Sequence, residues 1–287
     1  MWEKFAYPVC LAFAMAGGWI ALEAGIAPFV IYGVVSVATL LFVITGEILR
    51  TYEPAWKPRL KDNYYPDVVT LLLNNFLLQS PVVQLIIAGV ALQLAGGGLQ
   101  LWPEEWPLLQ AVLALVLGEF GAYWWHRASH ELPLLWRFHK IHHSPGRLYW
   151  LNATKFHYVD VTILQTCTVL PALLLGANQE SILFITLFSI FHGYWQHGNT
   201  RQSLGLLNYF LSNAELHRWH HNLDPAVANH NYGSNLIIWD LVFGTYFWPE
   251  RDHGDARGAR IEDIGIAERD YPTDPFRHLV QPFSRKG

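Results

Sequence analysis

Long runs of apolar residues dominate the first half of the chain. Two of them, residues 7–22 and 26–45, contain no charged residue and are separated only by Glu23-Ala24-Gly25. About 20 apolar residues cross a bilayer as a helix, so these runs predict a hairpin of two spanning helices. A cleaved signal peptide is the alternative for the first run, but a second apolar run follows it at once. Further runs at about residues 68–95 and 108–125 predict a third and a fourth span.

Basic residues are unevenly distributed among the segments that join these runs. Residues 50–65 contain four Lys or Arg and residues 126–155 contain five, whereas residues 96–107 contain two Glu and no basic residue. Loops rich in Lys and Arg stay on the cytoplasmic side. We therefore expect a multi-pass membrane protein with both termini and residues 126–155 at the cytoplasmic face. The compact chain favours a bacterial inner membrane.

The apolar stretch 161–191 has a different pattern. Pro171 and residues 176–180 divide it into two halves, each short for a span. We expect a helical hairpin that enters the membrane and returns, although two short tilted spans would have the same end points. After Asn199 the chain is mixed and polar, and residues 252–286 are charged and rich in Pro and Gly.

Composition supports a membrane protein. Charged residues make up 15% of the chain and hydrophobic residues 52%, against about 25% charged residues in soluble proteins. The net charge of −4 and the lack of a basic patch exclude a nucleic-acid binder. We expect an all-α fold: about four spanning helices, a short membrane-dipping hairpin and a cytoplasmic histidine-rich helical cap. The expected division is 1–107 for the N-terminal helices, 108–249 for a catalytic domain and 250–287 for a polar tail.

Histidine is the residue that changes this picture most. The chain contains 14 histidines, and eight of them lie in three clusters: HRASH at 126–130, HKIHH at 139–143 and HRWHH at 217–221. Positions i, i+3 and i+4 of a helix lie on one face, so each cluster presents two or three imidazoles to the same side. Neutral imidazole is the commonest metal ligand in proteins. Eight histidines exceed the three or four ligands of a zinc site, which indicates two metal ions.

Other histidines are less clearly placed by the sequence. His192 and His197 are five residues apart, so an ideal helix would point them in different directions, and each is still a candidate ligand. We expect His157 to lie near the site or the interface rather than to bind metal. His230, His253 and His278 have no partner at ligand spacing and are expected at the surface.

Three classes of function are compatible with histidine clusters in a membrane protein. A metal transporter or a b-type haem protein would carry its ligands within the spans, but these clusters lie at the ends of spans. A zinc-dependent hydrolase would explain the position at the membrane edge less well, and no GxSxG motif is present. Redox chemistry on a lipid C–H bond explains both the histidines and their position.

The ordered clusters, the QHGN segment and two further segments resemble one family. HRASH, HKIHHS and HRWHH are followed by NYG at 231–233 and WDLVFGT at 239–245. Over about residues 118–248 the chain is similar to the fatty acid hydroxylase/sterol desaturase superfamily. The resemblance implies a membrane-bound, non-haem di-iron oxygenase that hydroxylates or desaturates a fatty acyl, sterol or related lipid, with O2 as co-substrate.

The resemblance also implies the metal ligands and a need for electrons. No catalytic residue is expected beyond the ligands, which are His126, His130, His139, His142, His143, His192, His197, His217, His220 and His221. Because the segment after Trp248 is too short for an electron-carrier domain, we expect an external donor of ferredoxin or cytochrome type with its reductase. The expected docking surface for it consists of Arg127, Arg137, Lys140, Arg147 and Arg218. Acids expected to orient the imidazoles are Glu119, Asp160, Glu215, Asp224 and Asp240.

Overall fold

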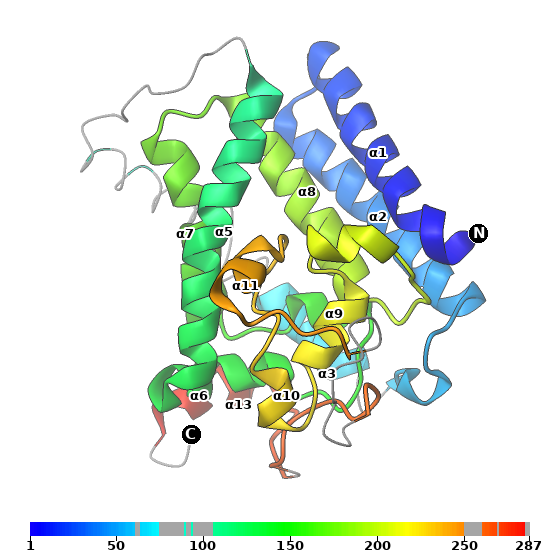
Figure 1. Cartoon of the computed structure of the whole chain (residues 1–287), viewed down its shortest axis with the longest axis vertical. Coiled ribbons are helices and arrows are strands. Elements are labelled where there is room, and N and C mark those ends of the chain that lie inside the picture. The colour runs from blue at the N-terminus through cyan, green and yellow to red at the C-terminus, as the bar shows by residue number, and fades with distance from the viewer. Residues whose placement is uncertain are drawn as a thin grey trace.

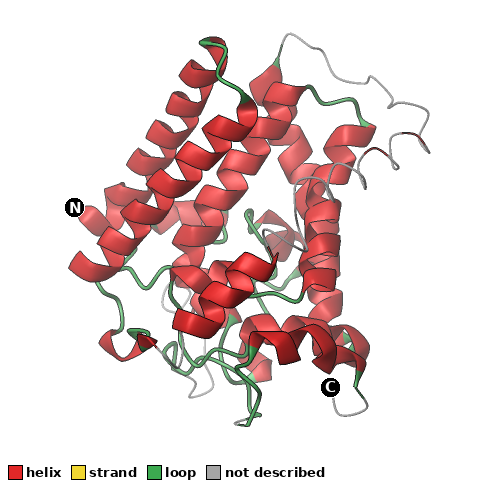
Figure 2. Cartoon of the chain, turned by 180° about the vertical axis from the view of Figure 1, so that it is seen from behind, coloured by secondary structure: helices red, strands yellow, loops and turns green. Residues whose placement is uncertain are grey.

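The computed structural model describes residues 1–60, 64–74, 89, 93, 106–249, 260–268 and 270–284. Within these ranges the protein is helical and has no strand, only three isolated β-bridges (Figures 1 and 2). The long helices are α1 (Trp2–Glu23), α2 (Pro28–Leu49), α5 (Pro107–Glu131), α7 (Tyr158–Leu174) and α8 (Gln179–His197). The shorter α-helices are α3 (Tyr65–Leu72), α6 (Pro133–His143), α9 (Ala214–His220), α10 (Pro225–Ala228), α11 (Ile238–Phe243) and α13 (Pro275–Val280). The 3₁₀ helices are η1 (Pro54–Trp56), η4 (Trp150–Thr154), η5 (Gly205–Tyr209) and η6 (Gln281–Phe283).

Three of the described helices are long and apolar enough to cross a membrane. They are α1, α2 and the part of α5 from Leu108 to Glu131. They match the first, second and fourth runs of the sequence pattern, so the all-helical fold with candidate spans at these runs is confirmed for the described residues. Most of the run at 68–95 lies outside the described residues, and α3 covers only its beginning.

Helices α5, α7 and α8 form a second part of the bundle. Antiparallel packing of α5 and α7 is so close at Gly118 that a Cβ atom there would lie 2.1 Å from the carbonyl oxygen of Thr168. At the far end, the Gln110 side chain is 3.1 Å from the Ser181 hydroxyl, so the turn between α7 and α8 lies level with the start of α5. The expectation that Pro171 divides this hairpin was wrong. Pro171 lies inside α7, and the break comes at Gly176, whose φ of 83° favours glycine.

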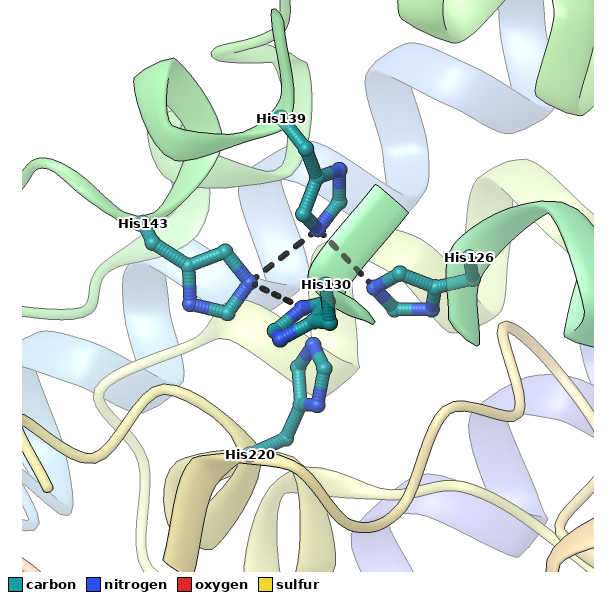
Figure 3. A group of neighbouring side chains, drawn as sticks. All are labelled: His126, His130, His139, His143 and His220. Atoms are coloured by element: carbon teal, nitrogen blue, oxygen red, sulfur yellow. Dashed lines mark hydrogen bonds between the residues drawn. The ribbon is translucent and has the colours of Figure 1, made fainter. Parts of the chain in front are cut away.

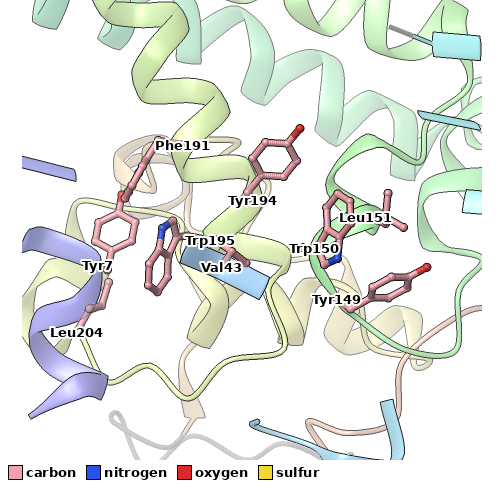
Figure 4. Packing of buried hydrophobic residues seen from close by; sticks show 9 residues of the cluster. All are labelled: Tyr7, Val43, Tyr149, Trp150, Leu151, Phe191, Tyr194, Trp195 and Leu204. Atoms are coloured by element: carbon pink, nitrogen blue, oxygen red, sulfur yellow. The ribbon is translucent and has the colours of Figure 1, made fainter. Parts of the chain in front are cut away.

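Aromatic packing joins the N-terminal hairpin to α8. The Tyr7 ring of α1 makes edge-on contacts with Phe191 and Trp195 of α8, at centroid distances of 5.4 and 5.8 Å (Figure 4). Val43 of α2 belongs to the same cluster, as do Tyr149, Trp150 and Leu151 in and beside η4. This core holds α1, α2 and α8 to the polar end of the molecule, where the short helices gather below the long ones (Figure 1).

Candidate metal centre

Five histidines from three helices converge at the polar end of α5. His126 and His130 lie on the last turns of α5, His139 and His143 on α6, and His220 on α9 (Figure 3). One ring nitrogen from each lies within 4.8 Å of the corresponding nitrogen of all the others. The Nε2 atoms of His126 and His139 are 3.0 Å apart, and those of His139 and His143 are 3.1 Å apart. We call these five residues group one.

Four further histidines form group two beside it. They are His142 of α6, His197 at the end of α8, His217 of α9 and His221, which follows α9 directly. Their Nε2 atoms are 3.3 Å apart for His142 and His197, 2.9 Å for His197 and His217, and 3.0 Å for His217 and His221. His143 and His221 stack at a centroid distance of 4.3 Å, so the two groups are adjacent.

Local sequence explains how α5 and α6 meet. The α5 helix ends at Glu131, and Leu132 is extended because the following residue is a proline. Pro133 then opens α6, a position where its missing N–H costs nothing. The short turn folds α6 back against the end of α5, which brings the HRASH and HKIHH clusters together.

The HxxHH pattern divides its imidazoles between the two groups. In α6 the first and third histidines, His139 and His143, belong to group one, and His142 belongs to group two. At α9 the assignment is reversed, since His217 and His221 belong to group two and His220 to group one. Each pattern therefore contributes to both groups, which sequence spacing alone does not reveal.

Hydrogen bonds on the outer side of the rings fix the tautomer of several histidines. In each case Nδ1–H donates to an oxygen, so Nε2 is left without a proton and faces the group. The donors, with acceptors and distances, are His126 to Tyr232 O (2.6 Å), His139 to Asp160 Oδ2 (2.8 Å), His220 to His230 O (2.8 Å), His142 to Lys155 O (3.2 Å) and His197 to Gly193 O (2.9 Å). His130 Nδ1 makes a corresponding contact of 3.1 Å to Asn229 Oδ1.

The two groups fit metal ions. Two nitrogens bound about 2.1 Å from one ion at a right angle lie about 3 Å apart, which is the spacing observed between the Nε2 atoms. His220 Nε2 is buried and has no hydrogen-bond partner among the described residues. Burial first, and then the neighbouring imidazoles, lower the pKa of His142, His143, His217, His220 and His221 well below the usual value. These histidines are therefore neutral, which is the form that binds metal.

His192 lies outside both groups. Tyr7 Oη donates to its Nδ1 over 2.7 Å, and its Nε2–H donates to the carbonyl oxygen of Ser212 over 2.8 Å. Both ring nitrogens are thus occupied by protein atoms, and the structure brings together nine of the ten histidines proposed as ligands. His157 accepts from Val159 N at the start of α7.

The other expected surface positions have different outcomes. The expectation that His278 lies at the surface was wrong, because its side chain is buried and donates to Pro272 O. His230 is partly buried. His253 lies outside the described residues.

The five acids expected to orient imidazoles differ in their contacts. Asp160 accepts directly from His139, and Trp125 Nε1–H donates to its other oxygen over 2.9 Å. Asp240 acts one step away: it accepts from the backbone N–H of Tyr232 and Gly233, and the Tyr232 carbonyl accepts from His126.

The remaining three acids have structural partners. Glu119 accepts from the Asn235 backbone and side chain, Glu215 from Leu204 N, and Asp224 from Ala226 N at the start of α10. Asn229 and the carbonyl groups that hold the rings were not found by sequence reasoning, because no residue type marks a backbone acceptor.

The docking surface expected for an electron donor needs correction. Arg218 is buried, donates to Gly198 O and Thr200 O, and lies 3.8 Å from the Tyr52 ring centroid. Lys140 is also buried. Its Nζ lies 3.5 Å from Glu268 Oε1 and 5.2 Å from the Tyr271 ring centroid. Neither Arg218 nor Lys140 therefore presents its charge at the surface for a partner protein.

Comparison with known proteins identifies the family. A family model described as fatty acid hydroxylase matches residues 111–245. The chain is 34% identical to the ornithine lipid hydroxylase of Rhizobium tropici over 99% of its own length and 85% of that protein. It is also 34% identical to the alkylglycerol monooxygenase of Danio rerio, over 53% of this chain and 32% of that protein. No solved structure matches.

These matches and the helical fold define an oxidoreductase related to lipid hydroxylases. The chain belongs to the fatty acid hydroxylase family. The resemblance seen in the histidine clusters is thereby confirmed, and the apolar helices are consistent with a membrane protein.

Proposed function

We propose that this protein is a di-iron oxygenase that hydroxylates a membrane lipid, with O2 and two electrons from an external donor. The observation that carries the proposal is the pair of buried histidine groups at the end of a candidate span, in a chain whose relatives are lipid hydroxylases. Nine imidazoles divided five and four suit two ions of intermediate softness. Group one and group two would each hold one iron.

The protein's own contribution is to bind, orient and enclose the ions. When bound, the two irons would supply the activation of O2 and the oxidising power that removes hydrogen from an unactivated carbon. Tyr232, Asp160 and Lys155 hold the rings of His126, His139 and His142 through Nδ1, so that Nε2 stays deprotonated. Burial of both groups excludes bulk water, which limits wasteful side reactions.

The substrate proposal follows a match that covers nearly the whole chain. The relative that covers 99% of this chain acts on ornithine lipids by its name, so we propose an ornithine lipid as the first substrate to test. Alkylglycerols come second, because that match covers about half of the chain. Hydroxylation is favoured over desaturation, since both of these relatives are named as hydroxylases or monooxygenases.

The arrangement in the membrane is part of the same proposal. Both termini and the histidine groups would face the cytoplasm, in a bacterial inner membrane. Residues 108–249 would form the catalytic domain, which is supported by the family match at 111–245. Residues 1–107 would form the N-terminal helices and 250–287 a polar tail, of which 250–259, 269 and 285–287 lie outside the described residues.

Metal analysis and product analysis together test the proposal. Protein purified from iron-supplied cells should contain about two irons per chain, and His142→Ala and His220→Ala should each lose metal. His278→Ala, which removes a buried histidine outside both groups, should keep it. With a chemical reductant, O2 and ornithine-lipid vesicles, the product should gain one oxygen atom derived from ¹⁸O2. The same assay is repeated with alkylglycerol vesicles. Full metal content in both ligand variants, or no oxygen incorporated into either the ornithine lipid or the alkylglycerol, would refute the proposal.

A further inference from the structure

An uncharged apolar surface covers the outer side of η5 and α11. Leu206 is 70% exposed, Phe210 60% and Val242 65%. Segments 205–211 and 237–244 contain a single charged residue, Asp240, and its side chain is fully buried. Contiguous exposed apolar side chains mark a membrane or protein contact. We call this the η5–α11 surface, made of Leu206, Leu207, Phe210, Leu241, Val242 and Phe243.

The two segments form one continuous surface. The backbone N–H of Ile237 donates to the carbonyl oxygen of Phe210 over 3.0 Å, and Leu211 pairs with Leu236 in an antiparallel bridge. These backbone contacts fix the end of η5 beside the start of α11. The apolar side chains are therefore held in place by the fold.

The η5–α11 surface continues onto the exposed side of α5. Phe120 and Trp124 of α5 are each 42% exposed. Phe120 meets Trp239 at a centroid distance of 4.9 Å, and Trp124 meets Phe243 at 5.0 Å. In Figure 1, α11 lies beside the lower half of α5, above the level of α6. Because α5 is a candidate span, its exposed aromatic side chains are expected to face lipid.

The position along α5 gives the depth of this contact. A helix rises 1.5 Å per residue, so Phe120 lies about 20 Å and Trp124 about 26 Å beyond Pro107. The hydrocarbon of a bilayer is about 30 Å thick. If it begins near the exposed Trp106, both contacts with α11 fall inside the hydrocarbon, in its last 10 Å or so.

We propose that the η5–α11 surface is immersed in the membrane leaflet at the histidine end of α5, and that the lipid substrate approaches the metal groups beside α11. The second part rests on the proposed function. The proposed approach beside α11 is based on contacts from the inner side of this helix to group one. Asp240 of α11 accepts from the backbone N–H of Tyr232 over 2.8 Å, and the carbonyl oxygen of Tyr232 accepts from His126 over 2.6 Å. One helix thus faces the leaflet with Val242 and supports a group-one histidine with Asp240.

Spin-label depth measurements test the immersion without any need for activity. Single-cysteine variants Leu206→Cys and Val242→Cys, made after replacing Cys10 and Cys167 by serine, carry a nitroxide in vesicles of phosphatidylethanolamine and phosphatidylglycerol. Ala226→Cys on α10, exposed at the polar end of the molecule, is the matched control. We expect collisions with O2 to exceed those with a water-soluble nickel complex several-fold at 206 and 242, and the reverse at 226.

Two results would overturn the immersion. Equal accessibility to the nickel complex at 242 and 226 would place the surface in water. Shielding from both reagents, with dipolar broadening between labels, would show that a second copy of this chain covers the surface instead.

A paired substitution tests the approach of the lipid. Val242→Glu places a charge on the immersed side, and Ala226→Glu places the same charge at the polar end. We expect Val242→Glu to lower kcat/KM for vesicle-embedded lipid at least tenfold with unchanged iron content, whereas Ala226→Glu leaves both unchanged. Unchanged kcat/KM in Val242→Glu would overturn this route. Failure of the proposed function can be distinguished from failure of this lipid route. In that case the unsubstituted protein would lack iron or activity, whereas the spin-label measurements would still show immersion.

Discussion

Replacement of Asp160 by asparagine is the sharpest test of how group one is held. Asp160 is buried, and its two oxygens accept from different donors, His139 Nδ1–H at 2.8 Å and Trp125 Nε1–H at 2.9 Å. Asparagine has the same shape but only one acceptor oxygen. Either Trp125 loses its partner, or the amide N–H₂ faces His139 and favours the tautomer with a proton on Nε2. A protonated Nε2 cannot bind metal.

The size of the effect follows from the loss of one orienting contact. Removing such a partner of a ligating histidine costs 10–100-fold in metal affinity, which is about 1.4–2.8 kcal/mol. We expect Asp160→Asn to weaken iron binding by that factor at one of the two ions, because His139 belongs to group one only. The ion in group two should keep its affinity.

Anaerobic competition of Fe(II) between the protein and a chelator measures both affinities. Asp224→Asn is the matched control, because Asp224 lies close to HRWHH in sequence but accepts from Ala226 N and touches no histidine ring in the described structure. It should stay within about twofold of the parent. Parental affinity at both ions in Asp160→Asn would refute the role of Asp160, and equal weakening at both would refute the assignment of His139 to group one.

Three further outcomes follow from other contacts. His192→Asn should retain two irons per chain in metal analysis, because both nitrogens of His192 bind protein atoms, and loss of an iron would make it a ligand. Gly118→Ala should lower the free energy of unfolding by about 1–3 kcal/mol in a thermal melt, since its Cβ would overlap Thr168 O, whereas Gly17→Ala, with open space around it, should not. Arg218→Met leaves Gly198 O and Thr200 O without their donor beside His197, so metal affinity at group two should fall at least tenfold in the chelator assay, and an effect at group one alone would contradict this.

The long helices and the histidine clusters could be predicted from the sequence, because both depend on local properties of the chain. The apolar runs that became α1, α2 and α5 are set by the bilayer length alone, and imidazole spacing in a helix is local geometry. Contacts between elements that are far apart in the sequence could not be predicted in this way. Arg218 is basic and beside a histidine cluster, yet the carbonyl groups that bury it come from the loop after α8. His192 was a candidate ligand beside His197, but its Nδ1 accepts from a tyrosine 185 residues earlier in the chain.

The division of each HxxHH pattern between the two groups explains why the chain carries the pattern twice. Group one takes ligands from α5, α6 and α9, and group two takes them from α6, α8 and the end of α9. Two ions bound there would therefore join α5 to α8 through the shared α6 and α9. Metal binding of this kind contributes directly to the free energy of folding. With both ions bound, the long helices on the two sides of the bundle would be joined at their polar ends by the same histidines that hold the metal.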